Sequence, residues 1–236
     1  MINFLDLIFP KRCVQCKKSG DYLCSDCFAF LSFDTKNLCL VCQRPVPDNF
    51  THKICLKRYA IDGCFSAVPY NKTVKKLIYN FKYKPYLSDL KKFLSDLMFE
   101  SLSQNESFNK ILKSSDSWVL IPISLHSSRF RKRGYNHSEI LAYELGKKLK
   151  IQVQTPLKRI KDTKSQYGLK LPQRKKNIKG AFGINSSFII NHSSLKTLSA
   201  FLVDDIVTTG STLLEAANIL KRNGANKVYG LTLARD

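Results

Sequence analysis

The sequence predicts an α/β protein in which a parallel sheet flanked by helices follows a small cysteine-rich segment. Two observations predict this class. All eight cysteines of the 236 residues lie at or before residue 64, and beyond them short apolar runs alternate with amphipathic stretches. Unbroken apolar strands separated by helices are typical of a parallel sheet that is covered on both faces.

The change in composition places a domain boundary between residues 56 and 64, so we divide the chain into residues 1–60 and 61–236. The first part is too short to bury a sufficient core and is expected to need a metal or disulfides. Residues 1–10 have no basic leader, so we expect a short packed helix there and not an export signal. The cysteines are therefore expected in the reducing cytoplasm, as metal ligands or free thiols.

The cysteines form two sets whose spacing fits tetrahedral zinc sites. The first set is Cys13-x2-Cys16-x7-Cys24-x2-Cys27, and the second is Cys39-x2-Cys42-x9-His52-x2-Cys55. Each set supplies four ligands and leaves no open position for water, which indicates one or two structural zinc ions. A redox dithiol, the relic of a lost site, and a metal shared between pairs of different sets stay open. Cys64 is expected to be a small buried core residue.

The second part of the chain alternates helix and strand patterns. Apolar residues recur at helical spacing over residues 71–84, 86–100, 137–149 and 211–222. Short, almost wholly apolar runs predict strands over residues 118–123, 200–203 and 228–233. Residues 100–117 are rich in serine and asparagine and are expected to form a linker, and residues 185–199 are a second polar stretch.

The most informative segment is FLVDDIVTTGST, residues 201–212. An apolar strand brings Asp204 and Asp205 to its carboxyl end, the edge of a parallel sheet where ligands bind. The turn that follows offers hydroxyls and backbone N–H groups at a helix N-terminus, which favour a bound phosphate. We call it the phosphate turn, and its residues are Thr208, Thr209, Gly210, Ser211 and Thr212. Carboxylates beside a phosphate suit sugar hydroxyls or Mg²⁺, so the segment indicates a ribose-5-phosphate site.

Two other interpretations of this segment stay open. Ser211 or Thr212 can be an ordinary helix N-cap. Paired aspartates after a strand also occur in phospho-receiver domains, but there they lie near the start of the domain. The sequence has neither a Walker lysine loop nor a G-x-G-x-x-G turn, so nucleoside triphosphate and dinucleotide sites lack their motifs.

Residues 201–212 resemble the phosphoribosyl-diphosphate (PRPP) signature of type I phosphoribosyltransferases, and the rest of the chain resembles the ComF family of competence proteins. IPISLHSSRFRKRGYNHSEILA, residues 121–142, is similar to that family's Pro-Val-Pro…Arg-Gly-Phe-Asn-Gln block. Residues 159–182 resemble the family's hood segment, and we call them the hood. The residues that carry this resemblance are Arg159, Thr163, Gln166, Arg174, Asn177 and Phe182. The cysteine pairs resemble its amino-terminal double zinc ribbon. The resemblance implies a type I phosphoribosyltransferase fold after a zinc-ribbon domain.

The resemblance also implies a role for each part of the site. Asp204 and Asp205 would meet the ribose hydroxyls and Mg²⁺, and the phosphate turn would hold the 5′-phosphate. Residues 124–128 would face the diphosphate, and the hood would close over the sugar. The sequence departs from the family pattern at His137, where glutamine is usual, and at His52, where cysteine is usual. His52 should still bind metal, because zinc accepts imidazole.

A basic and aromatic stretch, RFRKRGY, spans residues 129–135, and its cations are Arg129, Arg131, Lys132 and Arg133. These residues can bind single-stranded DNA with bases stacked on Phe130 or Tyr135, clamp a diphosphate, or lie in a solvated loop. Residues 72–84 form a second lysine-rich strip, for which a solvated helix face is the favoured interpretation. The net charge of +21 favours a polyanionic partner, with lysine-rich codon usage as the alternative.

As the resemblance implies, we expect a protein that binds a phosphoribosyl ligand and handles single-stranded DNA during natural transformation. It would act with a DNA-uptake helicase or channel protein, and no apolar run approaches the ~20 residues of a membrane span. An active phosphoribosyltransferase of nucleotide metabolism or salvage is the alternative, in which Mg²⁺ and cations would stabilise the departing diphosphate. A zinc-stabilised adaptor with a vestigial pocket is a third possibility. No general base for a nucleobase acceptor is evident in the sequence.

Overall fold

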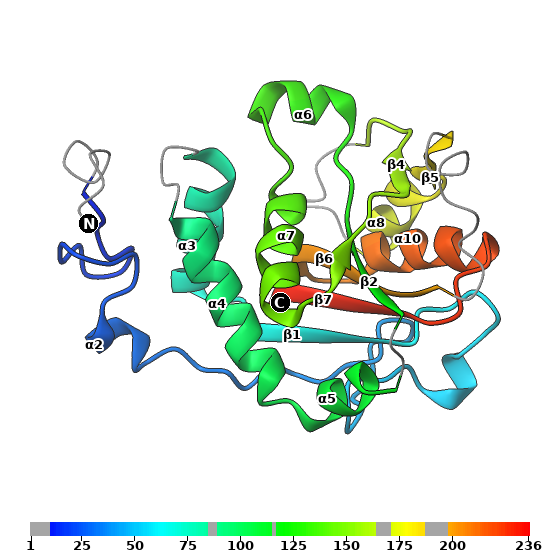
Figure 1. Ribbon diagram of the computed structural model, residues 1–236, viewed down its shortest axis with the longest axis horizontal. Helices are drawn as coiled ribbons and strands as arrows, with labels where there is room; N and C mark the ends of the chain where they lie inside the picture. Colours follow the sequence, from blue (N-terminus) through cyan, green and yellow to red (C-terminus); the bar gives the residue numbers. More distant parts are fainter. Residues whose placement is uncertain (1–9, 85–88, 115–116, 164–170, 187–197) are drawn as a thin grey trace.

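The computed structural model describes residues 10–84, 89–114, 117–163, 171–186 and 198–236. Its centre is a sheet in which every neighbouring pair of strands is parallel. The strands lie in the order β1 (Gly63–Pro69), β7 (Val228–Arg235), β6 (Ser199–Val207), β2 (Trp118–Pro122) and β3 (Gln152–Val153) (Figure 1). The predicted α/β class with a parallel sheet is confirmed.

Both faces of the sheet are buried, and the central strand β6 shows how. Phe201 and Val203 belong to the core on one face, whereas Ala200 and Leu202 belong to the core on the other, and all four are 0% exposed. Side chains alternate between faces along a strand, so a strand covered on both faces must be apolar throughout. This requirement explains the unbroken apolar runs of the sequence.

Helices cover the two faces. The first face is covered by α3 (Lys72–Tyr83), α4 (Leu90–Ser103), α5 (Glu106–Leu112) and α7 (His137–Leu149), and the second by α8 (Leu171–Ile178) and α10 (Ser211–Arg222) (Figure 1). The predicted helices over residues 71–84, 137–149 and 211–222 are confirmed. Asn71 begins α3, because its side chain accepts a hydrogen bond from the Val74 amide at 2.9 Å.

The expectation of a linker over residues 100–117 is wrong. Helix α4 continues to Ser103, and α5 follows directly. Asn105 is the N-cap of α5, and its side chain accepts from the Phe108 amide at 2.9 Å. Asparagine and serine serve helix caps as well as loops, so their abundance does not distinguish a capped short helix from a linker. Leu102 and Phe108 are buried, which makes this segment part of the core.

Several short elements were not predicted from the sequence. These are β1, β3, α8, the antiparallel pair β4 (Leu157–Arg159) and β5 (Phe182–Ile184), α6 (Ser127–Arg133), α2 (Ser25–Phe28) and the 3-10 turn η1 (Lys53–Cys55). Most of them have too few residues for a periodic pattern to develop. Strand β6 extends to Val207, so Asp204 and Asp205 lie inside it. The predicted helix over residues 1–10 and most of residues 185–199 lie outside the described residues.

The two cysteine sets attach to opposite faces of the sheet. We call residues 13–27 the first ribbon and residues 39–55 the second ribbon. Val14 of the first ribbon belongs to the core beneath α3 and α4, whereas Leu40 of the second ribbon belongs to the core beneath α10. Phe50 of the second ribbon also packs against the first core, beside Phe65, so the second ribbon contacts both faces.

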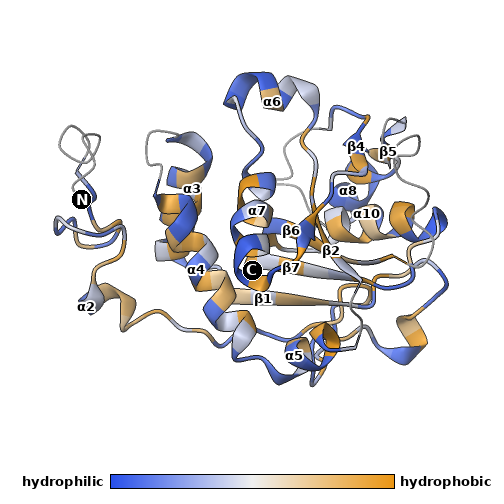
Figure 2. Cartoon of the chain, in the orientation of Figure 1, coloured by the Kyte–Doolittle hydropathy of each residue, from blue (hydrophilic) through white to orange (hydrophobic). Residues whose placement is uncertain are grey.

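Hydropathy follows this layering. The strands are coloured mostly hydrophobic, while α6, which stands above the sheet, is mostly hydrophilic (Figure 2). Among the residues that the structure describes, no helix is long and apolar enough to cross a lipid bilayer.

Truncation of Phe108 tests whether α5 is structural. The ring is 0% exposed and lies 5.7 Å from the ring of Phe65 and 5.5 Å from that of Phe201, centroid to centroid. We expect Phe108→Ala to lower the free energy of unfolding by about 3 kcal/mol in urea titrations. Lys110→Ala, at an exposed position of the same helix, should change it by less than ~0.5 kcal/mol. Equal values for the two variants would contradict the packing described.

Candidate functional site

The site lies where β6 leaves the sheet and α10 begins. Gly210 stands between them as the N-cap of α10, with φ 69° and ψ 2°. Having no side chain, it offers no cap itself, and the Thr209 hydroxyl accepts from the Ser211 amide at 3.4 Å. Glycine adopts this left-handed conformation without steric penalty, whereas other residues are strained in it. The predicted strand, turn and helix over residues 201–212 therefore form in the expected order.

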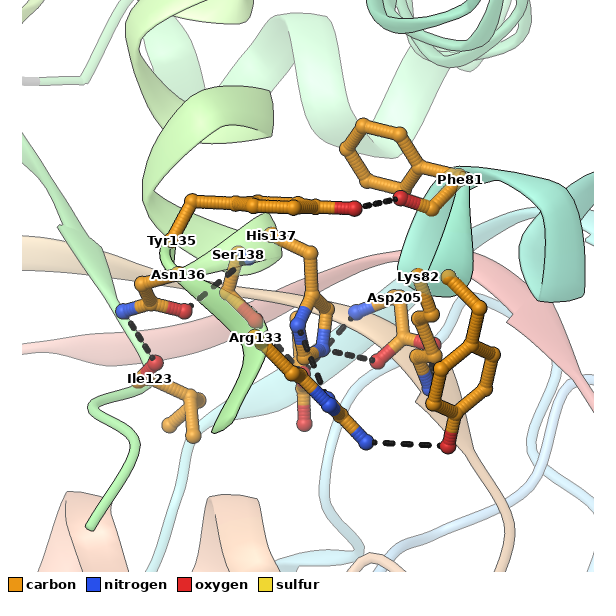
Figure 3. A network of polar contacts seen from close by, with 11 residues as sticks. Phe81, Lys82, Ile123, Arg133, Tyr135, Asn136, His137, Ser138 and Asp205 are labelled. Atoms are coloured by element: carbon orange, nitrogen blue, oxygen red, sulfur yellow. Dashed lines mark hydrogen bonds and ion pairs between the residues drawn. The ribbon is translucent and has the colours of Figure 1, made fainter. Parts of the chain in front are cut away.

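Asp205 is buried and held by two other side chains. It is 4% exposed, and one oxygen, Oδ2, forms an ion pair with Nζ of Lys82 from α3. The other oxygen, Oδ1, lies 3.1 Å from Nε2 of His137, the first residue of α7 (Figure 3). A buried carboxylate needs such partners because it has lost its water. Asp205 is thus turned toward the interior, whereas Asp204 beside it is partly exposed.

The hydrogen bonds fix the tautomer of His137. Nη1 of Arg133 lies 3.3 Å from Nδ1 of His137, and Nη2 of Arg133 donates to the Tyr83 hydroxyl at 3.1 Å. A guanidinium has only donors, so Nδ1 must accept and the proton of a neutral His137 lies on Nε2. His137 therefore donates to Asp205. Burial lowers the pKa of His137, which keeps the ring neutral despite the adjacent carboxylate.

The two aspartates have opposite pKa shifts. Burial acts to raise the pKa of Asp205, but Lys82 and His137 outweigh it and hold that pKa below its usual range. Burial and the charge of Asp205 raise the pKa of Asp204 to about 7. Asp204 Oδ1 accepts from the Ser138 hydroxyl and from the Asp205 amide, each at 2.9 Å. The pair thus carries less negative charge near neutral pH than two free carboxylates would.

The phosphate turn has contacts on three sides. Arg174 of α8 donates to the Thr208 hydroxyl, and the hydroxyls of Thr209 and Ser211 lie 2.9 Å apart. Gln43 of the second ribbon donates to the Thr209 carbonyl at 3.2 Å. The turn thus brings together a cationic side chain, hydroxyls and the start of a helix, which is the donor set that a phosphate group needs.

The four cations of the basic stretch do not have equal environments. Arg129 is half-buried and donates to the Thr163 carbonyl at 2.5 Å, and Arg133 is engaged by Tyr83 and His137. Arg131 and Lys132 are exposed, and so is Phe130. The stretch is helix α6, which ends at Gly134 with φ 79°. A solvated loop is therefore the wrong description of this stretch, since it forms a helix and two of its cations contact other segments of the chain.

A cavity of about 670 Å³ lies between α6, the loop after β2 and the hood. It is lined by Ser124 and His126 of that loop and by Arg159 of the hood. Arg159 is 7% exposed and stacks over Phe182 with 5.4 Å between the guanidinium carbon and the ring centroid. The structure thus places the predicted diphosphate loop and Arg159 of the hood around one cavity. Gln166, another predicted hood residue, lies outside the described residues.

Each ribbon gathers its four predicted ligands. The ligand atoms of Cys13, Cys16, Cys24 and Cys27 all lie within 4.8 Å of one another, and so do those of Cys39, Cys42, His52 and Cys55. The grouping follows the sequence sets and does not mix pairs from the two. His52 Nε2 lies 3.0 Å from the Pro45 carbonyl, which leaves Nδ1 to face the cysteines. Metal-bound histidines commonly make this backbone contact.

The thiols also fit a dication. Burial acts to raise the pKa of Cys39, but backbone N–H groups of Cys42 and His52 outweigh it and bring that pKa to about 6. Burial and the neighbouring Cys42 raise the pKa of Cys55 to about 11. Three neighbouring thiols do not ionise together unless a cation offsets their charge. Zn²⁺ is such a cation, and it accepts sulfur and imidazole nitrogen as tetrahedral ligands.

Comparison with known proteins agrees with this geometry. Residues 4–57 match the double zinc ribbon domain, and residues 132–236 match the phosphoribosyl transferase domain. Competence protein F of Haemophilus influenzae is 35% identical over 118 residues, which is 50% of each chain. The DNA utilization protein YhgH of Escherichia coli K12 is 34% identical over 117 residues, 49% of this chain and 48% of that protein. The chain thus spans about half the length of these relatives.

A longer match comes from Bacillus subtilis. Its competence protein ComFC is 27% identical over 229 residues, 92% of this chain and 86% of that protein. The fold and the two matched domains define a protein in which a double zinc ribbon precedes a phosphoribosyltransferase-type domain. The resemblance to the ComF family that the sequence motifs carry therefore agrees with these similarities to competence protein F and to ComFC.

Sequence reasoning located the turn and the ribbons but missed three neighbours of the aspartates. Lys82 was assigned to a solvated lysine strip, His137 was noted only as a departure from the family, and Ser138 was not singled out. Lys82 lies far from Asp205 along the chain, and no spacing rule connects them. A signal for His137 and Ser138 exists, because both follow the Asn136 cap and occupy the first turn of a helix.

Asp204→Asn tests the raised pKa of Asp204. This carboxyl titrates near 3.8 when free and near 7 in the fold, so the folded state binds more protons between these values. The free energy of unfolding therefore falls as pH rises through that range. Relative to the wild type, we expect Asp204→Asn to gain about 1 kcal/mol or more between about pH 5 and pH 8 in urea unfolding. The control Asp96→Asn should gain nothing, and identical pH slopes in all three proteins would contradict the shift.

Proposed function

We propose that this chain binds a phosphoribosyl compound of the PRPP type at the end of β6 and handles single-stranded DNA during DNA uptake. The observation that carries the first half is the juxtaposition of the aspartate pair with the phosphate turn. Asp204 is partly exposed at one end of the segment, and the left-handed Gly210 starts α10 at the other. A sugar bearing a phosphate presents both hydroxyls and an anion, the two kinds of group that these two parts of the segment would bind.

In this proposal the site residues have separate tasks. Asp204 accepts hydrogen bonds from the sugar hydroxyls, and Asp205 joins it when Lys82 releases its ion pair. The phosphate turn and Arg174 hold the 5′-phosphate through backbone N–H groups, hydroxyls and a guanidinium. When bound, Mg²⁺ would neutralise part of the negative charge of the diphosphate. Ser124 and His126, which line the cavity of about 670 Å³, would face the diphosphate.

The DNA half of the proposal rests on charge and exposed rings. Tyr79 and Tyr83 on α3 are 58% and 52% exposed, with ring centroids 4.9 Å apart. The guanidinium carbon of Arg133 in α6 lies 5.1 Å from the ring centroid of Tyr83 in α3. This contact places α3 beside α6, which also carries the exposed Arg131 and Lys132. Exposed aromatic rings beside cations bind single strands by stacking bases and neutralising phosphates. The relatives named as competence and DNA utilization proteins support the same assignment.

A phosphoribosyltransferase of nucleotide metabolism is the second candidate, since this fold alone does not decide between binding and catalysis. Such an enzyme needs a group that accepts a proton from its acceptor substrate. His137 is buried, and its Nδ1 already accepts from Arg133, so it is unsuited to that task. We therefore favour a ligand-binding protein that acts with a helicase or channel protein of the uptake machinery.

Calorimetric titration with PRPP and Mg²⁺ tests the ligand. We expect the wild type to bind and Asp204→Asn to lose at least about tenfold in affinity, because charge-assisted hydrogen bonds to the sugar are lost. Asp96→Asn, on the outer part of α4, should bind as the wild type does. Undetectable binding to the wild type would favour an adaptor with a vestigial pocket. Diphosphate release with a nucleobase would favour the enzyme.

Binding of a labelled oligonucleotide at increasing salt tests the DNA surface. The combined change of Arg131→Gln and Lys132→Gln should reduce the slope of log affinity against log salt by about 1.4, since each phosphate contact adds about 0.7. Tyr79→Ala should weaken binding by about 1–3 kcal/mol and leave the slope unchanged.

The matched control for this surface is Lys110→Gln with Lys113→Gln, two exposed lysines near the end of α5. This pair removes the same charge and should leave the salt slope close to that of the wild type. If both double variants shift the slope equally, net charge alone drives binding and the surface of α3 and α6 is not the interface.

A further inference from the structure

The second ribbon touches the phosphate turn through a glutamine. Gln43 directly follows Cys42 and has φ 62°, and its backbone N–H donates to the Cys39 carbonyl at 2.8 Å within the same tight turn. Its side-chain Nε2 donates to the Leu40 carbonyl at 2.7 Å and to the Thr209 carbonyl at 3.2 Å. One side chain therefore ties a metal-binding turn to a ligand-binding turn 166 positions away.

A close packing contact accompanies this hydrogen bond. A Cβ placed on Gly210 would lie 2.8 Å from Cδ2 of Leu40, the residue after the ligand Cys39. Leu40 is 2% exposed and packs in the same core as Leu213 of α10. Gly210 is thus required twice, once for its positive φ and once because Leu40 occupies the adjacent space.

A third contact connects the second ribbon to the end of β7. Nη2 of Arg235 donates to the Leu38 carbonyl at 2.9 Å, one residue before the ligand Cys39. The next residue, Asp236, donates its amide to the Val207 carbonyl at 3.0 Å, and Val207 directly precedes the phosphate turn. Arg235 and Asp236 therefore connect Leu38, the residue just before the second ribbon, to Val207 at the end of β6.

The first ribbon has a different set of contacts. Gln15, which lies between Cys13 and Cys16, accepts from the Thr73 hydroxyl at 3.3 Å and from Lys76 Nζ at 3.2 Å. Both donors belong to α3, on the opposite face of the sheet from α10. The two ribbons are alike in sequence pattern but support different elements.

We propose that the second ribbon is a positioning element for the phosphate turn. Metal bound to Cys39, Cys42, His52 and Cys55 fixes the turn that carries Leu40 and Gln43, and these two side chains hold Thr209 and Gly210 in the ligand-binding conformation. The identity of the ligand rests on the function proposed above, whereas the mechanical link between the ribbon and the turn does not depend on it.

Amide hydrogen exchange of the zinc-loaded full-length protein, without ligand, tests this link. Gln43→Met keeps the shape of the side chain, removes its N–H donor and leaves all four metal ligands in place. We expect exchange in residues 208–213 to accelerate roughly three- to tenfold, the effect of losing one hydrogen bond, with β6 and β7 unchanged. Gln15→Met is the matched control in the first ribbon and should leave residues 208–213 as in the wild type.

A second comparison removes one metal at a time. His52→Ala should lose the zinc of the second ribbon and accelerate exchange in the phosphate turn, whereas Cys16→Ser should lose that of the first ribbon and accelerate exchange in α3. Unchanged exchange of residues 208–213 in Gln43→Met overturns the proposal. So does equal acceleration by Gln43→Met and Gln15→Met, which would indicate general loosening. Gln43→Met carries the test even if His52→Ala does not fold.

Titration with ribose 5-phosphate separates this inference from the proposed function. If the wild type binds it, Gln43→Met should bind about three- to tenfold more weakly. If the wild type binds neither ribose 5-phosphate nor PRPP with Mg²⁺, the proposed ligand is wrong, but the exchange data still decide whether the second ribbon positions the turn.

Discussion

The buried charge of Asp205 is the constraint on which the site depends. A carboxylate buried near the carboxyl end of a central strand is stable only with partners that replace water. Those partners come from α3 through Lys82 and from α7 through His137, two helices that cover the same face of the sheet. The first turn of α7 also supplies Ser138 to Asp204. The position of these helices and the charge state of the aspartate pair are therefore linked.

This arrangement ties ligand binding to the nucleic-acid surface in the proposed function. Lys82 and the exposed Tyr83 are adjacent in α3, and Arg133 contacts both Tyr83 and His137. A sugar that takes the place of Lys82 beside Asp205 would act on the helix that carries the aromatic rings. The two proposed activities thus share one set of contacts and need not be independent.

The two ribbons lie in a segment that is too small to have a stable hydrophobic core of its own. A segment of about 60 residues buries too little apolar surface to be stable without metal or covalent links. Here each ribbon also places an apolar residue into the core of the larger domain, Val14 on one face and Leu40 on the other. The ribbons are therefore integral to the sheet's two cores, and the second reaches the phosphate turn itself.

The sequence by itself determined the parallel sheet, the main helices, the two ligand sets and the position of the phosphate turn. These features are local, because apolar strand runs, helix periodicity, ligand spacing and turn residues can each be recognised within a short segment of the sequence. Only the tertiary structure decided that Asp205 is turned inward onto Lys82, that Asn105 caps a helix in place of a linker, and that Gln43 meets Thr209. Each of these depends on residues distant in sequence or on burial, which a local pattern does not encode.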